Sequence, residues 1–564
     1  MTPVAVVGTG PATDALTAAL SEAAITVEHQ QDPESVDAEF VVAVDRAGAD
    51  TFRTVDERAR TDSQRWVAVE LGGVGGAPVV DAAITGFGPE SGCYDCLEAR
   101  VAAAVDGPVD GVDRPDSGTQ RYAGALAGHR IATALDGGER LSGTITEVPH
   151  AERTFLPVPG CACGPERDWE LRRGADDADT DALTRAERGL DERVGIVTEV
   201  GEAESFPAPY YLSTLCDTSG FSDAAAPRQA AGVGADWDTA FMKALGESYE
   251  RYAGGVYRTG TLPNRPPEDH VAPAAFVTPE SHTSEPPVAW VPGEQLASGT
   301  AAALPAETVF YPPPSERVRP ATTTGLGLGS SGTDALLAGL YEIVERDAAM
   351  LSWYSTYEPL AVRVGDHEGF ETLRRRASAE GLSVTPLLLT QDIDVPVVAV
   401  AVEGETWPKF ALGMAADLDP GQAAVGALAE ALQNWMELRG MGRSQAQEAD
   451  GAIGRYADRP RSVQSLTDTE TAVPLGRLGP DRVGEPPAEL ATLVERVTAV
   501  GIEPYGVRLT QRDLDAMGFE AVRVVCPSAQ PLVFGESYFG ERARSVPEEL
   551  GFEPRLDRAH HPFP

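Results

Sequence analysis

Three segments of the chain carry a pair of acidic or amide side chains three residues apart. The pairs stand in "ALGESYERYA", "GLYEIVERDA" and "ALAEALQNWM", and their members are Glu247 and Glu250, Glu342 and Glu345, and Glu430 and Gln433. Residues at this spacing share one face of an α-helix. One such pair is typical of a solvated helix face with ordinary ion pairs, whereas three matched copies favour a common chemical role.

Carboxylates that converge in one cleft repel each other, which raises their pKa values unless cations neutralise them. Magnesium meets that need, because it prefers oxygen ligands and completes its shell with water and substrate phosphates. Arg251 and Arg346 directly follow two of the acids. They are positioned either to bind phosphate or to pair with a neighbouring helix. The pattern therefore predicts a site for a metal-bound nucleotide.

Four of the six cysteines form two close pairs, with two residues between the members of one pair and one residue between the members of the other. These cysteines are Cys93 and Cys96, and Cys161 and Cys163. Two tight turns that each supply two thiolates complete a tetrahedral S4 zinc site, which is structural because no position stays open for chemistry. The alternative is four buried, reduced cysteines with unrelated roles. Cys216 and Cys526 are isolated, and we expect them to be packed.

The helices that position the acids have small residues on the same face. Ala335 and Ala338 precede the acids of the middle helix, and Ala423 and Gly426 precede those of the third. On the first helix the row contains Lys243 before Glu247 and Glu250. Small residues let these faces approach another backbone or a ligand closely.

The chain is long enough for two to four domains. We expect an α/β domain over residues 1–170, a charged linker over 171–190 and a larger domain over 191–564. The first domain opens with a strand, a turn at Gly8 and Gly10, and a helix, but Thr13 replaces the third glycine of the dinucleotide fingerprint. We therefore predict that this turn binds no nucleotide.

Two further segments are expected to lie outside the core. The polar stretch 441–470 indicates a surface excursion. The closing "HHPFP" cannot be helical, and we expect an extended tail there.

The composition excludes several classes of partner. The 564 residues contain 87 acidic and 45 basic side chains, so the net charge of -42 repels nucleic acids and anionic membranes. Lysine occurs at Lys243 and Lys409, and arginine supplies the other 43 basic residues (45 minus 2). This bias indicates adaptation to a high-salt, halophilic cytoplasm. No apolar run reaches membrane-span length and no basic flank marks a signal peptide, so we expect a cytoplasmic protein.

The motifs together resemble the YcaO superfamily, whose three ATP and magnesium motifs look like "GVGADWDTAFMKALGESYER", "TTTGLGLGSSGTDALLAGLYEIVERDA" and "ALAEALQNW" here. The segments "GCYDC" and "LPVPGCACG" resemble the ThiF-like zinc domain that accompanies azole-forming cyclodehydratases. The resemblance implies an α/β N-terminal ThiF-like domain with structural zinc, followed by a larger α+β YcaO domain.

By that resemblance the catalytic residues are Glu250, Glu345 and Arg346, and the magnesium ligands are Glu250, Glu345 and Glu430. The implied ATP-binding set is Glu247, Glu250, Arg251, Glu342, Glu345, Arg346, Glu430 and Gln433. The chain departs from the family at Val233, where a lysine is common, and at Thr324 and Ser330, where asparagine is frequent.

Family members phosphorylate the oxygen of a peptide amide, and the implied product is an azoline made from a Cys, Ser or Thr residue of a ribosomal precursor peptide, as in bacteriocin biosynthesis. The alternatives are YcaO-type thioamidation or sulfur incorporation, and a non-catalytic, ATP-binding scaffold for a peptide-modifying complex. The implied partners are the precursor peptide, a separate leader-peptide-binding protein and a flavin dehydrogenase, and we expect a homodimer.

Overall fold

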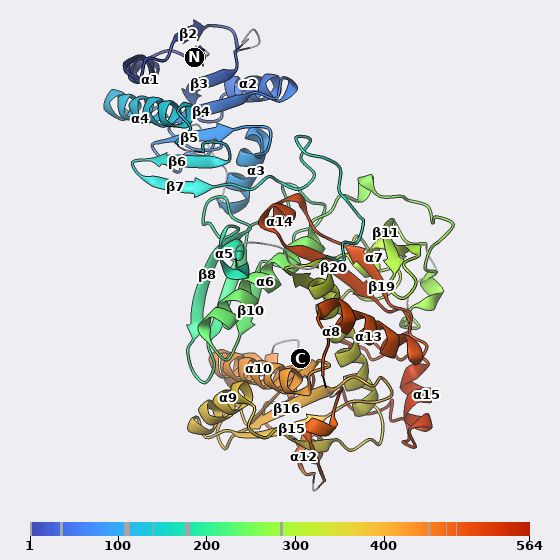
Figure 1. The fold of residues 1–564 in the computed structure, drawn as a ribbon. Helices are drawn as coiled ribbons and strands as arrows, with labels where there is room; N and C mark the ends of the chain where they lie inside the picture. Colours follow the sequence, from blue (N-terminus) through green and yellow to red (C-terminus); the bar gives the residue numbers. More distant parts are fainter. Residues whose placement is uncertain are drawn as a thin grey trace. The chain divides into compact units, whose positions relative to one another are not determined.

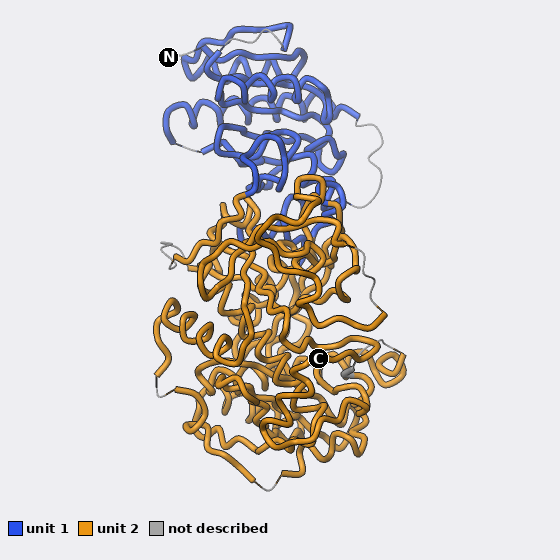
Figure 2. The backbone as a smooth tube through the Cα atoms, turned by 90° about the vertical axis from the view of Figure 1, so that its right-hand side faces the viewer, with its two compact units in different colours: residues 1–167, 187–199, 216–222 blue, residues 168–186, 200–215, 223–564 orange. Residues whose placement is uncertain are grey.

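The computed structural model describes residues 3–33, 38–105, 113–138, 140–174, 181–281, 286–448, 452–469, 471–480 and 482–564. These residues form two compact units (Figure 2). Unit 1 comprises residues 1–167, 187–199 and 216–222, and unit 2 comprises residues 168–186, 200–215 and 223–564. The expected linker at 171–190 includes residues 175–180, which lie outside the described residues, and the short helix α5, Ala182–Glu187.

Unit 1 is built on a seven-stranded sheet with the order β2-β1-β3-β4-β5-β6-β7 (Figure 1). Its first four strands are parallel and the remaining three are antiparallel. The strands are β1 Val4–Val7, β2 Val27–Gln30, β3 Phe40–Arg46, β4 Arg65–Leu71, β5 Ala82–Phe87, β6 Thr144–Val148 and β7 Ala151–Thr154. Continuous burial of β1, β3 and β4 agrees with strands covered by helices on both faces.

Helices pack on the two faces of this sheet. Helices α1, Pro11–Glu22, and α4, Ser117–Leu135, lie against each other at Gly124, where an added Cβ would come within 2.0 Å of the Ala12 carbonyl oxygen. Helix α2, Asp50–Thr61, packs on β3, β4 and α3, Tyr94–Ala104. The turn before α1 favours glycine at two positions, because Gly8 and Gly10 both have positive φ.

The described residues of unit 2 contain two five-stranded sheets and a three-stranded sheet, except for the first three residues of β8, which are assigned to unit 1. The three-stranded sheet has the order β10-β9-β8, with β8 Val197–Glu204, β9 Tyr210–Leu215 and β10 Gln229–Val233. The second sheet consists, in order, of β12 Ala301–Pro305, β11 Trp290–Gln295, β19 Tyr505–Arg508, β20 Glu520–Val525 and β13 Leu326–Gly329. The third consists of β17 Phe410–Ala416, β16 Val397–Glu403, β15 Ser383–Leu388, β14 Leu360–Arg363 and β18 Ala472–Pro474.

In each sheet, one strand leads into one of the long helices that carry an acid pair. Helix α6, Trp237–Gly255, follows β10; α8, Gly332–Trp353, follows β13; and α10, Pro420–Glu448, follows β17 (Figure 1). Each helix folds back onto the strand that precedes it. Unit 2 thus contains three strand–turn–helix pairs of the same construction.

The remaining helices of unit 2 surround this framework. They are α7 Ala306–Val309, α9 Glu368–Ala379, α11 Ala452–Tyr456, α12 Arg461–Thr467, α13 Pro486–Ala499, α14 Arg512–Met517 and α15 Arg542–Glu549. The expectation that 441–470 is a surface excursion is wrong for its described part, because that part contains the end of α10 together with α11 and α12. Tyr456 and Val463 from this stretch belong to the core.

The C-terminal tail has no helix, as expected, but it is packed rather than free. Phe563 and His561 are buried, and the indole of Trp353 donates a hydrogen bond to the Ala559 carbonyl. In the part of the chain that the structure describes, no helix has the length and apolar character needed to cross a membrane.

Candidate functional site

The three acid-bearing helices begin at residues whose side chains satisfy their first backbone N–H groups. The Asp236 carboxylate accepts from the Thr239 amide at the start of α6, and the Ser331 hydroxyl accepts from the Asp334 amide at the start of α8. At α10 the Asp419 carboxylate accepts from the Gly421 amide. These caps fix where each helix starts, and therefore where its acids point.

A glycine on each preceding strand brings the helix unusually close. An added Cβ would lie 2.2 Å from the Ala240 carbonyl oxygen at Gly232, 2.2 Å from the Ala335 carbonyl oxygen at Gly327 and 2.2 Å from the Ala431 nitrogen at Gly413. The small residues on the helix faces thus pack against the strand backbone. The sequence predicted close approach by these faces, but not the strand glycines that allow it.

The first acid of each pair is bound to the strand on which its helix rests. Glu247 accepts a hydrogen bond from the Ala231 amide at 2.9 Å, and Glu342 accepts one from the Gly325 amide at 2.9 Å. Glu430 likewise accepts from the amide of Met414. Each of the three strand–helix pairs therefore holds one carboxylate in the same local position.

Five of the six paired residues form an electrostatically connected group within unit 2, hereafter the acid cluster: Glu247, Glu250, Glu342, Glu345 and Glu430. Burial raises the pKa of Glu250 to about 8, and the neighbouring carboxylates of Glu342 and Glu247 add to the effect. Burial also raises the pKa of Glu345 well above its usual range, with Glu430 and Glu342 acting in the same direction. The structure thus brings acids of α6, α8 and α10 together.

Arg346 partly neutralises this group. Its Nε lies 3.4 Å from Glu345 Oε1, its Nη2 lies 3.6 Å from Glu342 Oε1, and its Nη1 donates to the Pro564 carbonyl oxygen at 2.6 Å. The C-terminal residue is therefore fixed beside the acid cluster.

The other two predicted site residues have local partners. Arg251 donates to Glu247 of its own helix and to the Gln229 carbonyl of β10. Gln433 donates to Glu437 of its own helix at 3.0 Å, and the Tyr210 hydroxyl donates to the same carboxylate at 2.8 Å.

Arg523 is a cation near the acids that the sequence did not indicate. Arg523 is 2% exposed and donates to the carbonyls of Thr322 and Thr323, both at 2.8 Å. Burial lowers its pKa to about 9, with repulsion from Arg319, while Glu342 and Glu250 oppose the shift. Arg523 lies 177 residues after Arg346 in the chain (523 minus 346), so helical spacing could not have placed it here.

The three positions at which the chain departs from the family pattern have different surroundings. Val233 is buried in the core at the end of β10, and Ser330 accepts a hydrogen bond from Arg185 at 2.8 Å. Thr324 lies in the turn before β13.

The carboxylates of the acid cluster fit magnesium in chemistry but are widely spaced. Among the residues that the structure describes, only the cysteine group combines three or more potential ligands whose atoms all lie within 4.8 Å of one another. Carboxylates with raised pKa values favour a bound cation. Their wide spacing leaves coordination positions on that cation for phosphate and water. The predicted magnesium ligands Glu250, Glu345 and Glu430 all belong to this cluster.

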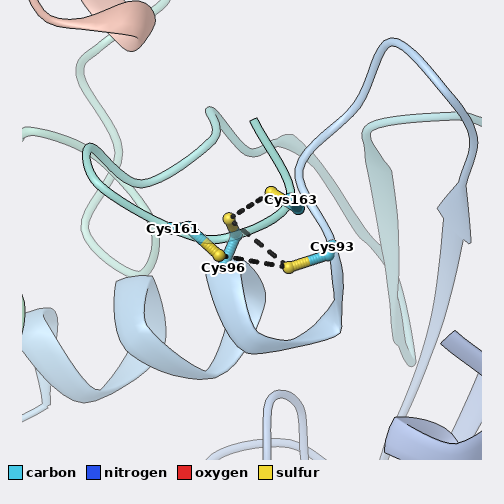
Figure 3. A group of neighbouring side chains, drawn as sticks. All are labelled: Cys93, Cys96, Cys161 and Cys163. Atoms are coloured by element: carbon cyan, nitrogen blue, oxygen red, sulfur yellow. Dashed lines mark hydrogen bonds between the residues drawn. The ribbon is translucent and has the colours of Figure 1, made fainter. Parts of the chain in front are cut away.

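The four paired cysteines of unit 1 converge as predicted (Figure 3). Their Sγ atoms are 3.7 Å apart for Cys93 and Cys96, and 3.5 Å apart both for Cys93 and Cys161 and for Cys96 and Cys163. Four sulfurs about 2.3 Å from a tetrahedral zinc lie roughly 3.8 Å from one another, so the cluster fits a zinc site. Cys216 and Cys526 are buried and remote from this group, as expected.

Comparison with known proteins places the chain in a family. The family model described as YcaO cyclodehydratase, ATP- and Mg²⁺-binding, matches residues 231–530. The chain belongs to the YcaO family. The matched range contains all three acid-bearing helices, so the acid cluster lies in the family's ATP- and magnesium-binding domain.

Similar solved structures cover both units of this YcaO protein. A solved heterocyclase in complex with substrate and cofactor is 20% identical with a TM-score of 0.74, and the match covers 98% of this chain and 83% of the other. The heterocyclase TruD is 19% identical with a TM-score of 0.65, covering 97% and 82%. A protein of Methanothermobacter thermautotrophicus is 26% identical over 329 residues, which are 56% of this chain and 85% of that one. The fold is a heterocyclase fold.

Proposed function

We propose that this YcaO protein activates backbone amides of a ribosomal peptide by ATP- and magnesium-dependent O-phosphorylation, and so converts Cys, Ser or Thr residues into azolines. The observation that carries the proposal is the acid cluster, in which burial and mutual repulsion raise the pKa values of Glu250 and Glu345. Buried acids of this kind mark a site prepared for cations.

The reaction follows from the chemistry of an amide. The thiol or hydroxyl of the peptide side chain attacks the preceding carbonyl carbon, and the oxyanion takes the terminal phosphoryl group of ATP. Phosphate then leaves with the former amide oxygen, which is a poor leaving group until it is phosphorylated. Glu250, Glu345 and Glu430 would hold magnesium, which would supply charge neutralisation during that transfer.

The other residues of the proposed site position the nucleotide or bind its phosphates. Glu247 and Glu342 are fixed by backbone amides of β10 and of the turn before β13, so they position the nucleotide rather than move. Arg346 is held between two acids and Pro564, which directs its guanidinium toward phosphate oxygens. Arg251 and Gln433 complete the proposed nucleotide-binding set.

The first prediction concerns the acid in closest contact with Arg346. Changing Glu345 to Gln is expected to lower peptide-dependent phosphate release on the order of a hundredfold or more, because one ligand of the phosphoryl-transfer metal is lost. The matched control is Glu495→Gln on the exposed face of α13, which is expected to keep wild-type turnover.

Mass spectrometry of the peptide separates the proposed product from its alternatives. Loss of one water per modified residue supports azoline formation, whereas exchange of oxygen for sulfur indicates a thioamide. Binding of Mg²⁺ and AMPPCP with no peptide turnover indicates a scaffold. Wild-type turnover in Glu345→Gln contradicts the catalytic assignment.

The substrate and partner assignments belong to the same proposal. The substrate is a precursor peptide, delivered by a separate leader-binding protein and passed to a flavin dehydrogenase that oxidises azolines. The active form is a homodimer. Copurification of a tagged chain with candidate partner proteins, followed by light scattering, tests both statements.

A further inference from the structure

We infer that Lys243 binds the phosphate chain of the nucleotide, as a cation of the site that the acid-pair pattern does not include. This inference rests on the proposed function, because it requires a nucleotide in unit 2. It assigns a binding role to one of the two lysines of the chain.

Lys243 lies on the acid-bearing face of α6. It precedes Glu247 by four residues and Glu250 by seven, which puts the three side chains in one row of the helix. From α10, Glu430 interacts favourably with its ammonium, while surrounding protein lowers the pKa of Lys243. Lys243 therefore lies on one helix of the acid cluster and interacts electrostatically with an acid of a second helix.

The other cations beside the acid cluster are already engaged. Arg346 contacts Glu342, Glu345 and Pro564. Arg251 donates to Glu247 and Gln229, and Arg523 donates to Thr322 and Thr323, as described above. Each of these guanidinium groups therefore has protein partners already in the absence of a nucleotide.

Lys243 is different in this respect. Within the described residues, no hydrogen bond or ion pair holds its ammonium, although the charge of Glu430 acts on it. Its side chain is exposed to solvent even though dense protein around it lowers its pKa. A solvent-accessible cation enclosed by protein is available to a ligand.

The chemistry of a nucleotide explains why such a group is needed. A triphosphate that enters a cluster of five carboxylates meets repulsion that metal ions and mobile cations must offset. A compact ammonium can interact with the charge of Glu430 in the free protein and with a phosphate when a nucleotide is bound, without the fixed bidentate geometry of an arginine. This reason accounts for a lysine in a chain that otherwise uses arginine 43 times (45 minus 2).

The scarcity of lysine makes a direct test possible. The probe is an acyl phosphate of ATP with Mg²⁺: a lysine amine next to the phosphate chain attacks the acyl carbonyl, the acyl–phosphate bond breaks, and ATP leaves as an amide forms. Peptide mapping by mass spectrometry then distinguishes Lys243 from Lys409, which lies in the exposed loop before β17. We expect acylation of Lys243 that excess ATP suppresses, and no ATP-sensitive acylation of Lys409.

Nucleotide affinity gives the second readout. Lys243→Met is expected to weaken binding of Mg²⁺ and AMPPCP on the order of thirtyfold in calorimetry, because a desolvated charge contact to phosphate is lost. Lys243→Arg should recover only part of the affinity, and Lys409→Met should bind as wild type. Thermal melts without nucleotide verify that each variant is folded.

The outcomes separate this inference from the function on which it rests. If wild type binds nucleotide while Lys243 stays unlabelled and Lys243→Met binds equally well, the inference is overturned and the proposed function stands. If wild type binds no nucleotide under any magnesium concentration, the proposed function itself is overturned.

Discussion

Glu250 shows how one residue couples the charge of the site to its stability. Its carboxyl has a pKa raised from 4.5 to about 8, first by burial and then by Glu342 and Glu247. In the unfolded chain the group ionises near its ordinary pKa. Between these two values the folded protein holds a proton that the unfolded protein has released, so stability falls as the pH rises through this window and levels off above about 8.

The second prediction follows from that linkage. Glu250→Gln removes the group that must stay protonated in the folded state. The metal-free variant should therefore melt a few degrees above wild type at pH 8, and its melting temperature should decline less from pH 5 to 8. The expected gain in the free energy of unfolding at pH 8 is roughly one kcal/mol or more. Differential scanning calorimetry without Mg²⁺ provides the measurement.

Bound metal and nucleotide should reverse this order, so that wild type melts at a higher temperature than Glu250→Gln. Saturating Mg²⁺ and AMPPCP stabilise the wild type by mass action, because the ionised carboxylate becomes a ligand, and they should stabilise Glu250→Gln much less. Equal nucleotide-induced shifts in both proteins would mean that Glu250 does not contact the bound group.

At the scale of single elements, the three strand–helix pairs determine where the acids lie. Each pair combines a capped helix start, a strand glycine beneath the helix and a glutamate bound to a strand amide. The acids of three helices, separated by up to 183 residues in sequence (430 minus 247), therefore occupy matching local positions.

The third prediction tests the close approach of helix to strand. Gly327→Ala puts a methyl group 2.2 Å from the Ala335 carbonyl oxygen, so α8 must move away from β13. We expect a loss of stability of about 1–3 kcal/mol, and weaker nucleotide binding because Glu342 and Glu345 move with the helix.

A glycine elsewhere in a long helix provides the control. Gly440 lies two residues before the kink of α10 at Gly442 and has open space around its Cβ position, so Gly440→Ala is expected to leave the stability within about 1 kcal/mol of wild type. Urea unfolding followed by circular dichroism compares the two variants. A Gly327→Ala variant as stable as wild type would contradict the packing argument.

Local sequence patterns predicted part of this arrangement and missed the rest for physical reasons. Spacing along a helix correctly placed Glu342 and Glu345 on one face, and paired cysteines predicted the S4 cluster, because both signals are local. Helical spacing could not predict that Arg523 lies near the acids, since its strand, β20, joins β13 only through a long-range strand pairing. The stretch 441–470 was misjudged because few apolar residues, such as Tyr456 and Val463, anchor a largely polar segment in the core.

At the scale of the whole molecule, the acid cluster and the candidate zinc site belong to different units of the chain. The acid cluster belongs to unit 2, which has its own hydrophobic core, and the four cysteines belong to unit 1, whose sheet has a separate core around Val4, Val42 and Val69. In unit 1 the cysteines connect the start of α3 to the segment after β7, which contains Cys161 and Cys163. A zinc ion bound by these cysteines would close a loop of the small unit, and none of the proposed nucleotide ligands lies in that unit.

The last prediction tests that separation. The Cys93→Ala, Cys161→Ala double variant is expected to lose a stoichiometric zinc, because two of four thiolates are missing, whereas Cys216→Ala should keep it. Without zinc the segment around Cys161 loses its link to α3, so limited proteolysis should cut unit 1 near residues 155–167 while peptides from α6, α8 and α10 stay protected. Binding of Mg²⁺ and AMPPCP should persist in the double variant, since none of its proposed ligands lies in unit 1. Zinc retained at full stoichiometry would contradict the S4 assignment, and nucleotide binding lost together with zinc would show that unit 1 also supports the nucleotide site.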